Sequence, residues 1–289
     1  MFYIYGVSQA GHGHIKKGVP NQDALAYKII NERAAIGVIA DGVGSAAKAE
    51  EASRIAADSF IKRICDIYEK FEDLFFGESD KTRFLRDAFA YANNAIIDHA
   101  GVHDLLDYDT TLTACLLCEN KLFYGHAGDS GLIALKTNGL YELVTQKAQD
   151  DLGRVYPLAM TNNWSFGEVD DVSSVLMATD GVLDFICPVF IRDSDEPLRI
   201  DILEYFMNYI EELTNGAELK AIQENVDKFI ASIPSDVISD DKTALVIINA
   251  DFPATRQPEE YYALRNWQKI KEEYDEAWRK KAYPDIFKS

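Results

Sequence analysis

The sequence predicts an α+β fold in which two mostly antiparallel sheets pack face to face with helices outside. Three observations lead to this prediction. Short runs rich in β-branched and aromatic residues open the chain, two long amphipathic patterns follow, and a series of strand patterns joined by short turns comes next. Two more amphipathic patterns and one apolar run follow that series. Because the helical patterns are grouped rather than alternating with strands, a parallel βαβ fold is disfavoured.

The first strand patterns cover residues 2–5, 25–30 and 35–39, and each ends in turn-forming residues. Apolar residues three and four positions apart then predict helices over 45–71 and 82–100. Each of these helices has one apolar face, so each needs a surface to cover.

Strand patterns separated by short turns predict an antiparallel meander in the middle of the chain. The four strands are expected at 110–118, 121–127, 131–136 and 140–144. Residues 146–171 show no convincing period and are expected to form a long loop, and long ordered loops are often functional. The remaining predicted elements are a strand at 174–178, helices at 200–213 and 218–233, and a strand at 243–249.

The organisation of the chain predicts a single domain over residues 1–251 and a helical extension over 252–289. Aromatic and apolar residues four and three apart draw a narrow stripe on the extension. Two interpretations stay open: the stripe packs on its own domain, or it docks a partner or a second subunit. The stripe consists of Ala263, Trp267, Ile270, Tyr274 and Ala277, with Trp278 beside it.

Composition excludes several classes of protein. The 289 residues are 47% hydrophobic and carry a formal net charge of -19, which predicts a folded chain and disfavours nucleic acid and membrane surfaces as partners. The sequence has no apolar stretch of about 18 residues and no signal-peptide pattern, so we expect a cytoplasmic protein. Four cysteines are too few for a disulfide framework, and the pair Cys115 and Cys118 lies in an apolar strand pattern without a second ligand pair. Buried, reduced thiols are therefore expected.

Acidic residues stand where predicted strands begin or end. Several such ends can meet at one rim of a sandwich, and carboxylates brought together repel one another unless a cation compensates their charge. Oxygen ligands favour hard ions such as Mg²⁺ or Mn²⁺, and Gly42 allows the backbone to approach such an ion. The alternative for each single site is that an Asp beside a Gly only forms a turn. The residues concerned are Asp23, Asp41, Asp129, Asp180 and Asp240.

Six ordered motifs resemble those of the metal-dependent serine/threonine protein phosphatases of the PPM, or type 2C, family, and bacterial-type members in particular. The resemblance extends in order to about Asn249, and six matches together are specific where one alone is weak. The matching segments are Gly11 to Asp23, Ala40 to Gly44, Asp109 to Thr111, Gly125 to Ser130, Ala178 to Val182 and Asp240 to Thr243.

The resemblance implies a four-layer α/β/β/α sandwich with a site for two Mn²⁺ or Mg²⁺ ions between the sheets. Asp41 would bridge both ions, with the Gly42 carbonyl on one ion and Asp180 and Asp240 on the other. Asp23 would lie in or beside this ligand set. Asp129, together with Asp180, would correspond to a weaker third metal position. Asp241 stands where the family often has Asn and is expected to be a neighbour more than a ligand.

The implied reaction is hydrolysis of phosphoserine or phosphothreonine by a metal-bridging hydroxide, which opposes a protein kinase in signalling. The expected partners are therefore a phosphorylated protein and a cognate kinase or its target. Asp41, Asp23 and His14 are the candidate catalytic residues. A non-enzymatic member that binds phosphoproteins or a kinase stays open as an alternative, as does a hydrolase of small phosphate esters.

Departures from the family pattern affect phosphate binding and leaving-group protonation. Gln22 replaces a Glu, Gly18 stands where a phosphate-binding Arg is expected, and Val43 stands where eukaryotic relatives have a general-acid His. The candidates to replace these functions are His12, His14, Lys16 and Lys17. Residues 150–166 occupy the place of the family's substrate flap, where Arg154 and Tyr156 could reach a phosphoprotein.

Overall fold

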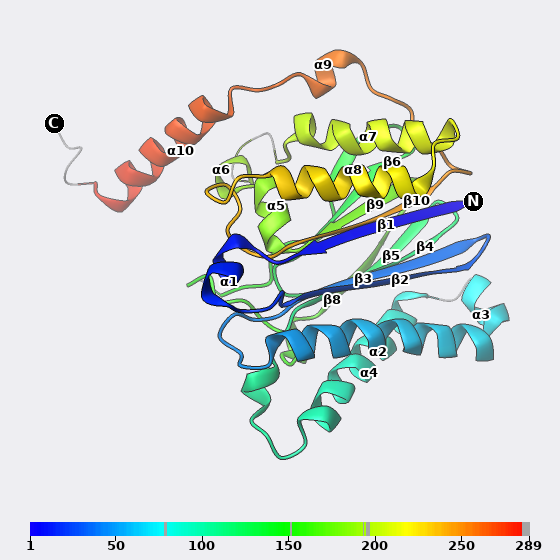
Figure 1. Ribbon diagram of the computed structural model, residues 1–289. Coiled ribbons are helices and arrows are strands. Elements are labelled where there is room, and N and C mark those ends of the chain that lie inside the picture. Colours follow the sequence, from blue (N-terminus) through cyan, green and yellow to red (C-terminus); the bar gives the residue numbers. More distant parts are fainter. Residues whose placement is uncertain (78–79, 151, 193, 195–196, 285–289) are drawn as a thin grey trace.

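The computed structural model describes residues 1–77, 80–150, 152–192, 194 and 197–284, and shows two five-stranded sheets packed face to face (Figure 1). All neighbouring strands in both sheets pair antiparallel. The first sheet has the order β1 (Phe2–Gln9), β10 (Lys242–Asn249), β9 (Val172–Ala178), β6 (Gly131–Lys136), β7 (Tyr141–Leu143). The second has the order β2 (Asp23–Asn31), β3 (Ala34–Asp41), β4 (Leu112–Cys118), β5 (Lys121–Ala127), β8 (Ser165–Val169).

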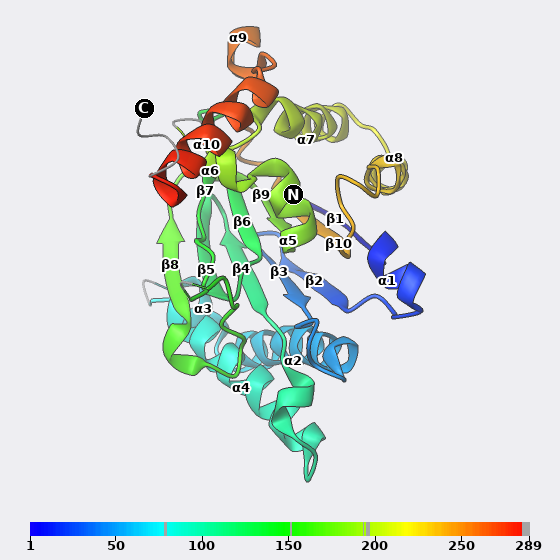
Figure 2. The ribbon, with the colours of Figure 1, turned by 90° about the vertical axis from the view of Figure 1, so that its left-hand side faces the viewer.

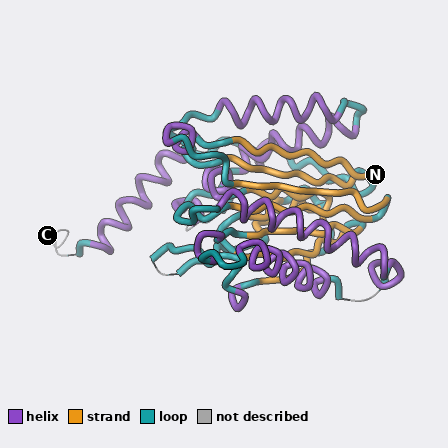
Figure 3. Tube along the Cα trace, turned by 60° about the horizontal axis from the view of Figure 1, so that its bottom comes forward, coloured by secondary structure: helices purple, strands orange, loops and turns teal. Residues whose placement is uncertain are grey.

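Helices cover the outer face of each sheet and complete the four layers (Figures 1 and 3). The second sheet is covered by α2 (Ala49–Lys70) and α4 (Thr82–Ala100), with the short α3 (Glu72–Phe76) between them in the chain. The first sheet is covered by α5 (Asp180–Ile186), α7 (Ile200–Thr214) and α8 (Leu219–Ser232), and the short α6 (Val189–Arg192) follows α5. The predicted α+β sandwich is confirmed.

Three apolar layers hold the sheets and helices together. Strand β3 is apolar along nearly its whole length because both of its faces are covered. Its Ile36 and Val38 contribute to the layer beneath α2 and α4, whereas Ala35 and Ile39 contribute to the layer between the two sheets. The third layer lies between the first sheet and its helices.

Several elements differ from the sequence-based expectation. The four strands predicted as one meander are divided between the sheets, because β4 and β5 pair in the second sheet and β6 and β7 pair in the first. The segment 146–171 is not entirely loop, because its end forms the edge strand β8. Strand β8 is short and contains Gly167, so it gave little alternating signal. The helix α1 (His12–Lys17) was not predicted because Ile15 is its only large apolar residue. Helix α5 was also missed, because seven residues are too few for a clear period.

The C-terminal extension binds the edge of the first sheet before it leaves the body. The Thr255 amide donates to the Thr137 carbonyl oxygen over 2.9 Å, and the Tyr141 amide of edge strand β7 donates to the Tyr261 hydroxyl over 3.2 Å. Short helix α9 (Glu259–Tyr262) follows, and α10 (Trp267–Ala282) then extends outward (Figures 1 and 2).

The start of α10 packs on the rest of the chain. Trp267 is buried, and its indole nitrogen donates to Asp201 over 3.2 Å, whereas Trp278 farther along is 53% exposed. The predicted stripe was wrong at Ala263, because the chain between α9 and α10 is not helical and Asn266 caps the start of α10. The division of the chain into a domain over residues 1–251 and a separate helical extension over 252–289 stays a prediction.

The remaining expectations concern membranes and thiols. In the described part of the chain, no helix is long and apolar enough to cross a membrane. The four cysteines are free thiols, three of them buried.

We predict that Phe60→Ala destabilises the protein by about 3–5 kcal/mol, because it removes a fully buried ring that packs edge-on against Phe89 of α4. Urea unfolding followed by circular dichroism measures the loss. Lys62→Ala, an exposed position on the same helix, is the matched control and should change stability by no more than about 0.5 kcal/mol. Equal effects of the two variants would contradict the packing of α2 against α4.

Candidate metal centre and active site

The predicted acidic residues come together at one rim of the sandwich. A cavity of about 150 Å³ lies where strands of both sheets end. Four carboxylates line it, and the lining contains no Lys or Arg among the residues that the structure describes. The lining residues that matter here are His14, Asp41, Gly42, Asp129, Asp180 and Asp240.

The end of β3 positions Asp41 and Gly42. The Asp41 amide donates to the Thr111 hydroxyl over 2.9 Å, and the Asp41 carbonyl oxygen accepts from the Thr111 amide and the Thr110 hydroxyl over 2.8 and 2.9 Å. At Gly42 a Cβ atom would lie 2.7 Å from the Ala49 carbonyl oxygen at the start of α2. Only glycine therefore fits this close approach, and the two threonines hold the Asp41 backbone in place.

Asp129 follows β5 after a glycine with a positive φ angle. Gly128 has a φ of 116°, and a Cβ atom there would lie 2.5 Å from the Thr111 side chain. Few residues other than glycine could adopt this turn at position 128. The turn places Asp129 in the lining of the cavity, where Asp129 is only 7% exposed.

Asp180 is the first residue of α5. Thr179 precedes it as the N-cap with extended backbone angles, and the Thr179 carbonyl oxygen accepts from the Leu183 amide over 2.8 Å. The end of β9 and the start of α5 thus place the Asp180 carboxylate at the positive end of a short helix.

Asp23 lies behind the cavity rather than in its lining. It pairs directly with Asp41 in the register of β2 and β3, and only 8% of it is exposed. Its carboxylate accepts a 2.8 Å hydrogen bond from the Thr179 hydroxyl. The structure therefore places Asp23 next to the predicted ligands, where it holds the residue before Asp180.

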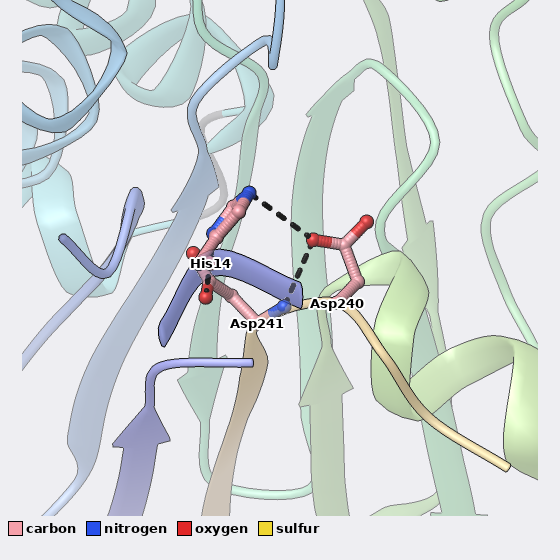
Figure 4. A group of neighbouring side chains, drawn as sticks. All are labelled: His14, Asp240 and Asp241. Atoms are coloured by element: carbon pink, nitrogen blue, oxygen red, sulfur yellow. Dashed lines mark hydrogen bonds and ion pairs between the residues drawn. The ribbon is translucent and has the colours of Figure 1, made fainter. Parts of the chain in front are cut away.

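His14 and Asp240 close the cavity on the side of α1 (Figure 4). The His14 Nδ1 atom lies 2.8 Å from Asp241 Oδ1, and its Nε2 atom lies 3.9 Å from Asp240 Oδ1. Within the described residues, these three side chains are a set of metal-type ligands whose atoms all lie within 4.8 Å of one another.

Asp241 is better explained as a support for His14 than as a metal ligand. Its two oxygens accept from the Gly11 amide over 2.6 Å and from the Gln22 amide over 2.7 Å, and it is 2% exposed. The protein already satisfies both oxygens of Asp241. Asp240 is far more exposed, and its Oδ1 accepts from the Asp241 amide over 2.9 Å, so Asp240 is the better candidate ligand of the pair.

Proximity and loss of water raise the pKa values of the clustered carboxyl groups. Burial raises the pKa of Asp23 to about 7, opposed by hydrogen bonds from Thr243 and Thr179. The pKa of Asp180 rises to about 6 through burial and the charges of Asp129 and Asp240. Removal from water and the neighbouring charges raise the pKa of Asp41 well above its usual range.

The donor set fits hard divalent cations. All the side-chain donors except His14 are carboxylate oxygens, which Mg²⁺ and Mn²⁺ prefer, and their mutual repulsion is the cost that a bound cation removes. Asp41, Asp180, Asp240 and the Gly42 carbonyl are the groups that would hold two ions.

The structure also places the residues that depart from the family pattern. Gln22 and Val43 line the cavity. Gly18 has a φ of 69° and ends α1, which explains a glycine where an Arg was expected. His12 and Lys16 are exposed and outside the cavity lining, so only His14 of the two histidines is near the carboxylates.

Two larger hollows of about 520 Å³ each share residues with the metal cavity. One includes His14 and Lys17 and extends along residues 44–51. The other lies under the predicted flap and includes Arg154 and Tyr156. The three hollows therefore adjoin one another at this rim of the sandwich.

Sequence reasoning missed the residues that support this centre. Thr111 was noted only as part of a small-residue turn, although it contacts the backbone of Asp41. Lys147, whose ammonium lies 2.8 Å from Asp184, was not identified. The four-residue spacing of Asp180 and Asp184 could have indicated that Asp184 lies near the centre, but only if α5 had been recognised as a helix.

Comparison with known proteins agrees with this fold. A profile of the protein phosphatase 2C family matches residues 10–230. Comparison with curated protein sequences gives no significant match. Among solved structures, a bacterial serine phosphatase is 14% identical, with a TM-score of 0.58, and the match covers 89% of this chain and 100% of that one.

Two further structures are similar. The serine/threonine phosphatase Stp1 from Staphylococcus aureus is 15% identical, with a TM-score of 0.57, and 86% of this chain and 95% of that chain are covered. The catalytic domain of the serine/threonine protein phosphatase PstP, in complex with two manganese ions, is 19% identical, with a TM-score of 0.55 and coverage of 86% and 97%.

The family profile and the layered fold together define the class of this protein, a protein phosphatase built on a sandwich of two sheets. The chain belongs to the protein phosphatase 2C family. The predicted family and the enzyme class of protein serine/threonine phosphatase are thereby confirmed, and the use of two Mn²⁺ or Mg²⁺ ions is a property of that family.

We predict that the metal-free protein loses stability as the pH rises from 6 to 8. Asp23, Asp41 and Asp180 have raised pKa values, so the folded state holds protons that the unfolded state has already released. Their stabilisation is complete below pH 4 or so and is lost as the pH passes about 6 and 7. Thermal unfolding in EDTA should show a midpoint a few degrees lower at pH 8.

Manganese should reverse this loss, because the ions replace the protons as partners of the carboxylates. The rise in unfolding temperature on adding Mn²⁺ should be larger at pH 8 than at pH 6. A metal-free midpoint that rises with pH over this range would contradict the proposed charge cluster.

Proposed function

We propose that this protein removes phosphate from phosphoserine and phosphothreonine side chains of other proteins with the help of two divalent ions. One observation carries the proposal: four carboxylates from separate strand and helix ends line one small cavity. A signalling role that opposes a protein kinase is part of the same proposal, because a kinase must form the phosphoester that this site hydrolyses.

The residues of this site have different roles. Asp41, Asp180, Asp240 and the Gly42 carbonyl hold the ions, and Asp23 orients the turn at Thr179. When bound, the ions supply a water of lowered pKa and neutralise charge on the phosphoryl oxygens. His14, fixed by Asp241, lies at the edge of the cavity where it can donate a proton to the departing hydroxyl oxygen.

The shape of the site supports a polypeptide substrate. The central cavity, at about 150 Å³, accommodates a group of the size of phosphate, whereas the two adjoining hollows can take the chain on either side of the phosphorylated residue. Lys17 brings a positive charge to one hollow, whereas Arg154 in the other hollow is paired with Asp150 over 2.6 Å.

The first test is manganese-dependent release of phosphate from a phosphothreonine peptide. Asp41→Asn should lower kcat by at least about 10³-fold, because it removes the carboxylate that would contact both ions. Asp58→Asn, at an exposed position on α2, is the control and should retain the wild-type rate.

Comparison of substrates separates this proposal from the two other functions considered. Faster turnover of sugar phosphates or nucleotides than of phosphopeptides would show a hydrolase of small esters. Binding of a phosphoprotein without turnover under any divalent ion would show a non-enzymatic binding protein, although no feature of the cavity favours that function.

A second test asks whether His14 protonates the leaving group. We expect His14→Asn to slow hydrolysis of phosphoserine peptides by about 10²-fold, because a serine alkoxide is a poor leaving group. Hydrolysis of p-nitrophenyl phosphate should fall much less, since p-nitrophenolate needs no proton. His12→Asn is the matched control, and equal losses on both substrates in His14→Asn would contradict this role.

A further inference from the structure

Lys147 is a basic residue held next to the acidic centre. Its side chain is only 12% exposed, and its ammonium lies 2.8 Å from Asp184 Oδ1 on α5. Arg192 of α6 approaches the same Asp184 oxygen over 3.0 Å. Asp184 lies four residues after Asp180, on the same face of the helix. The charged groups of Lys147 and Arg192 therefore lie one helical turn from Asp180, which is a predicted metal ligand.

The backbone around Lys147 is anchored to the strand that leads to Asp129. The Ala148 amide donates to the Gly128 carbonyl oxygen over 2.7 Å. On the other side of Lys147, His126 Nε2 lies 3.0 Å from the Gln146 carbonyl oxygen. Because both neighbouring residues are tied to the segment around Gly128, the Lys147 ammonium has a defined place beside the centre.

The charge of Lys147 acts on two of the cavity carboxylates. Burial raises the pKa of Asp129, and Lys147 is the largest influence opposing that rise. Lys147 also opposes the rise in the pKa of Asp180. By contrast, the charges that act most on Asp41 are those of four other carboxyl groups. Lys147 compensates the charge of Asp129 and Asp180 without belonging to the described lining of the cavity.

We propose that the Lys147 ammonium takes the place of a third divalent ion beside Asp129, Asp180 and Asp184, so that the centre of this protein holds two ions. An ammonium and a guanidinium already pair with Asp184, and both repel a divalent ion that would approach it. The inference rests on the proposed function in that it assumes the two-ion centre.

The experiment counts manganese ions on the full-length protein. Protein stripped with EDTA is titrated with Mn²⁺ alone, and bound and free metal are measured by equilibrium dialysis and by the EPR signal of free Mn²⁺. We expect two ions per wild-type chain and three per chain for Lys147→Met. Lys147→Arg keeps the charge and should stay at two. Lys121→Met is the matched control, since it also breaks a lysine–carboxylate ion pair, on strand β5, and it should stay at two.

A second variant shows where the added ion binds. Combining Lys147→Met with Asp184→Asn should weaken the third ion by about tenfold or more, because one of its carboxylates is lost. Circular dichroism establishes that each variant is folded, and Lys147→Gln replaces Lys147→Met if the latter is not.

The outcomes are distinct. Three ions on the wild-type chain, or two on both wild type and Lys147→Met, would overturn the inference and leave the proposed function intact. No tightly bound ion on the wild-type chain would instead overturn the two-ion centre, and with it both proposals. Asp41→Asn, which should lose the bound ions, verifies that the ions counted are those of the centre.

Discussion

Mutual repulsion among carboxylates at one rim of the sandwich is the constraint on which the site depends. Asp41, Asp129 and Asp180 come from separate parts of the chain, and each has a raised pKa because burial removes it from water and because its neighbours are also acidic. Such a cluster is destabilising by itself. The surrounding fold must therefore hold the groups in place, and a cation must compensate their charge.

The fold meets this requirement with backbone contacts that allow little freedom. The Asp41 backbone is clamped by Thr110 and Thr111, and glycines at 42 and 128 permit approaches that any Cβ atom would block. These contacts belong to strand ends, while the apolar layers that stabilise the sandwich lie farther along the strands. Stability and metal binding are thus separated along each strand, so that the rim can stay acidic.

Charge compensation differs between the two sides of the centre. At Asp41 the strongest charges are those of other carboxyl groups, and the described lining of the cavity has no Lys or Arg. On the Asp129 side, Lys147 and Arg192 pair with Asp184. This asymmetry is a property of the particular chain, because it arises from the segment after β7 and from α6.

The acidic sequence motifs predicted which residues meet at the rim, whereas the hydrophobic repeat along the chain predicted only some of the helices and strands. Strands and long helices were found because burial on one or both faces imposes a repeat on the residues. Helix α1 and strand β8 have too few apolar residues to show such a repeat, and their positions are set by contacts with other segments. In α1, for example, Gly13 donates its amide to the Ser239 carbonyl oxygen, over 220 residues away in the chain.

What the sequence determined by itself was the layered architecture and the acidic residues that line the cavity, because both leave local patterns of residue type. Only the tertiary structure decided that His14, rather than His12, borders the cavity, that Asp23 lies behind it, and that Lys147 stands beside Asp129. These placements depend on distances between segments that are remote in the chain, and no local pattern encodes such distances.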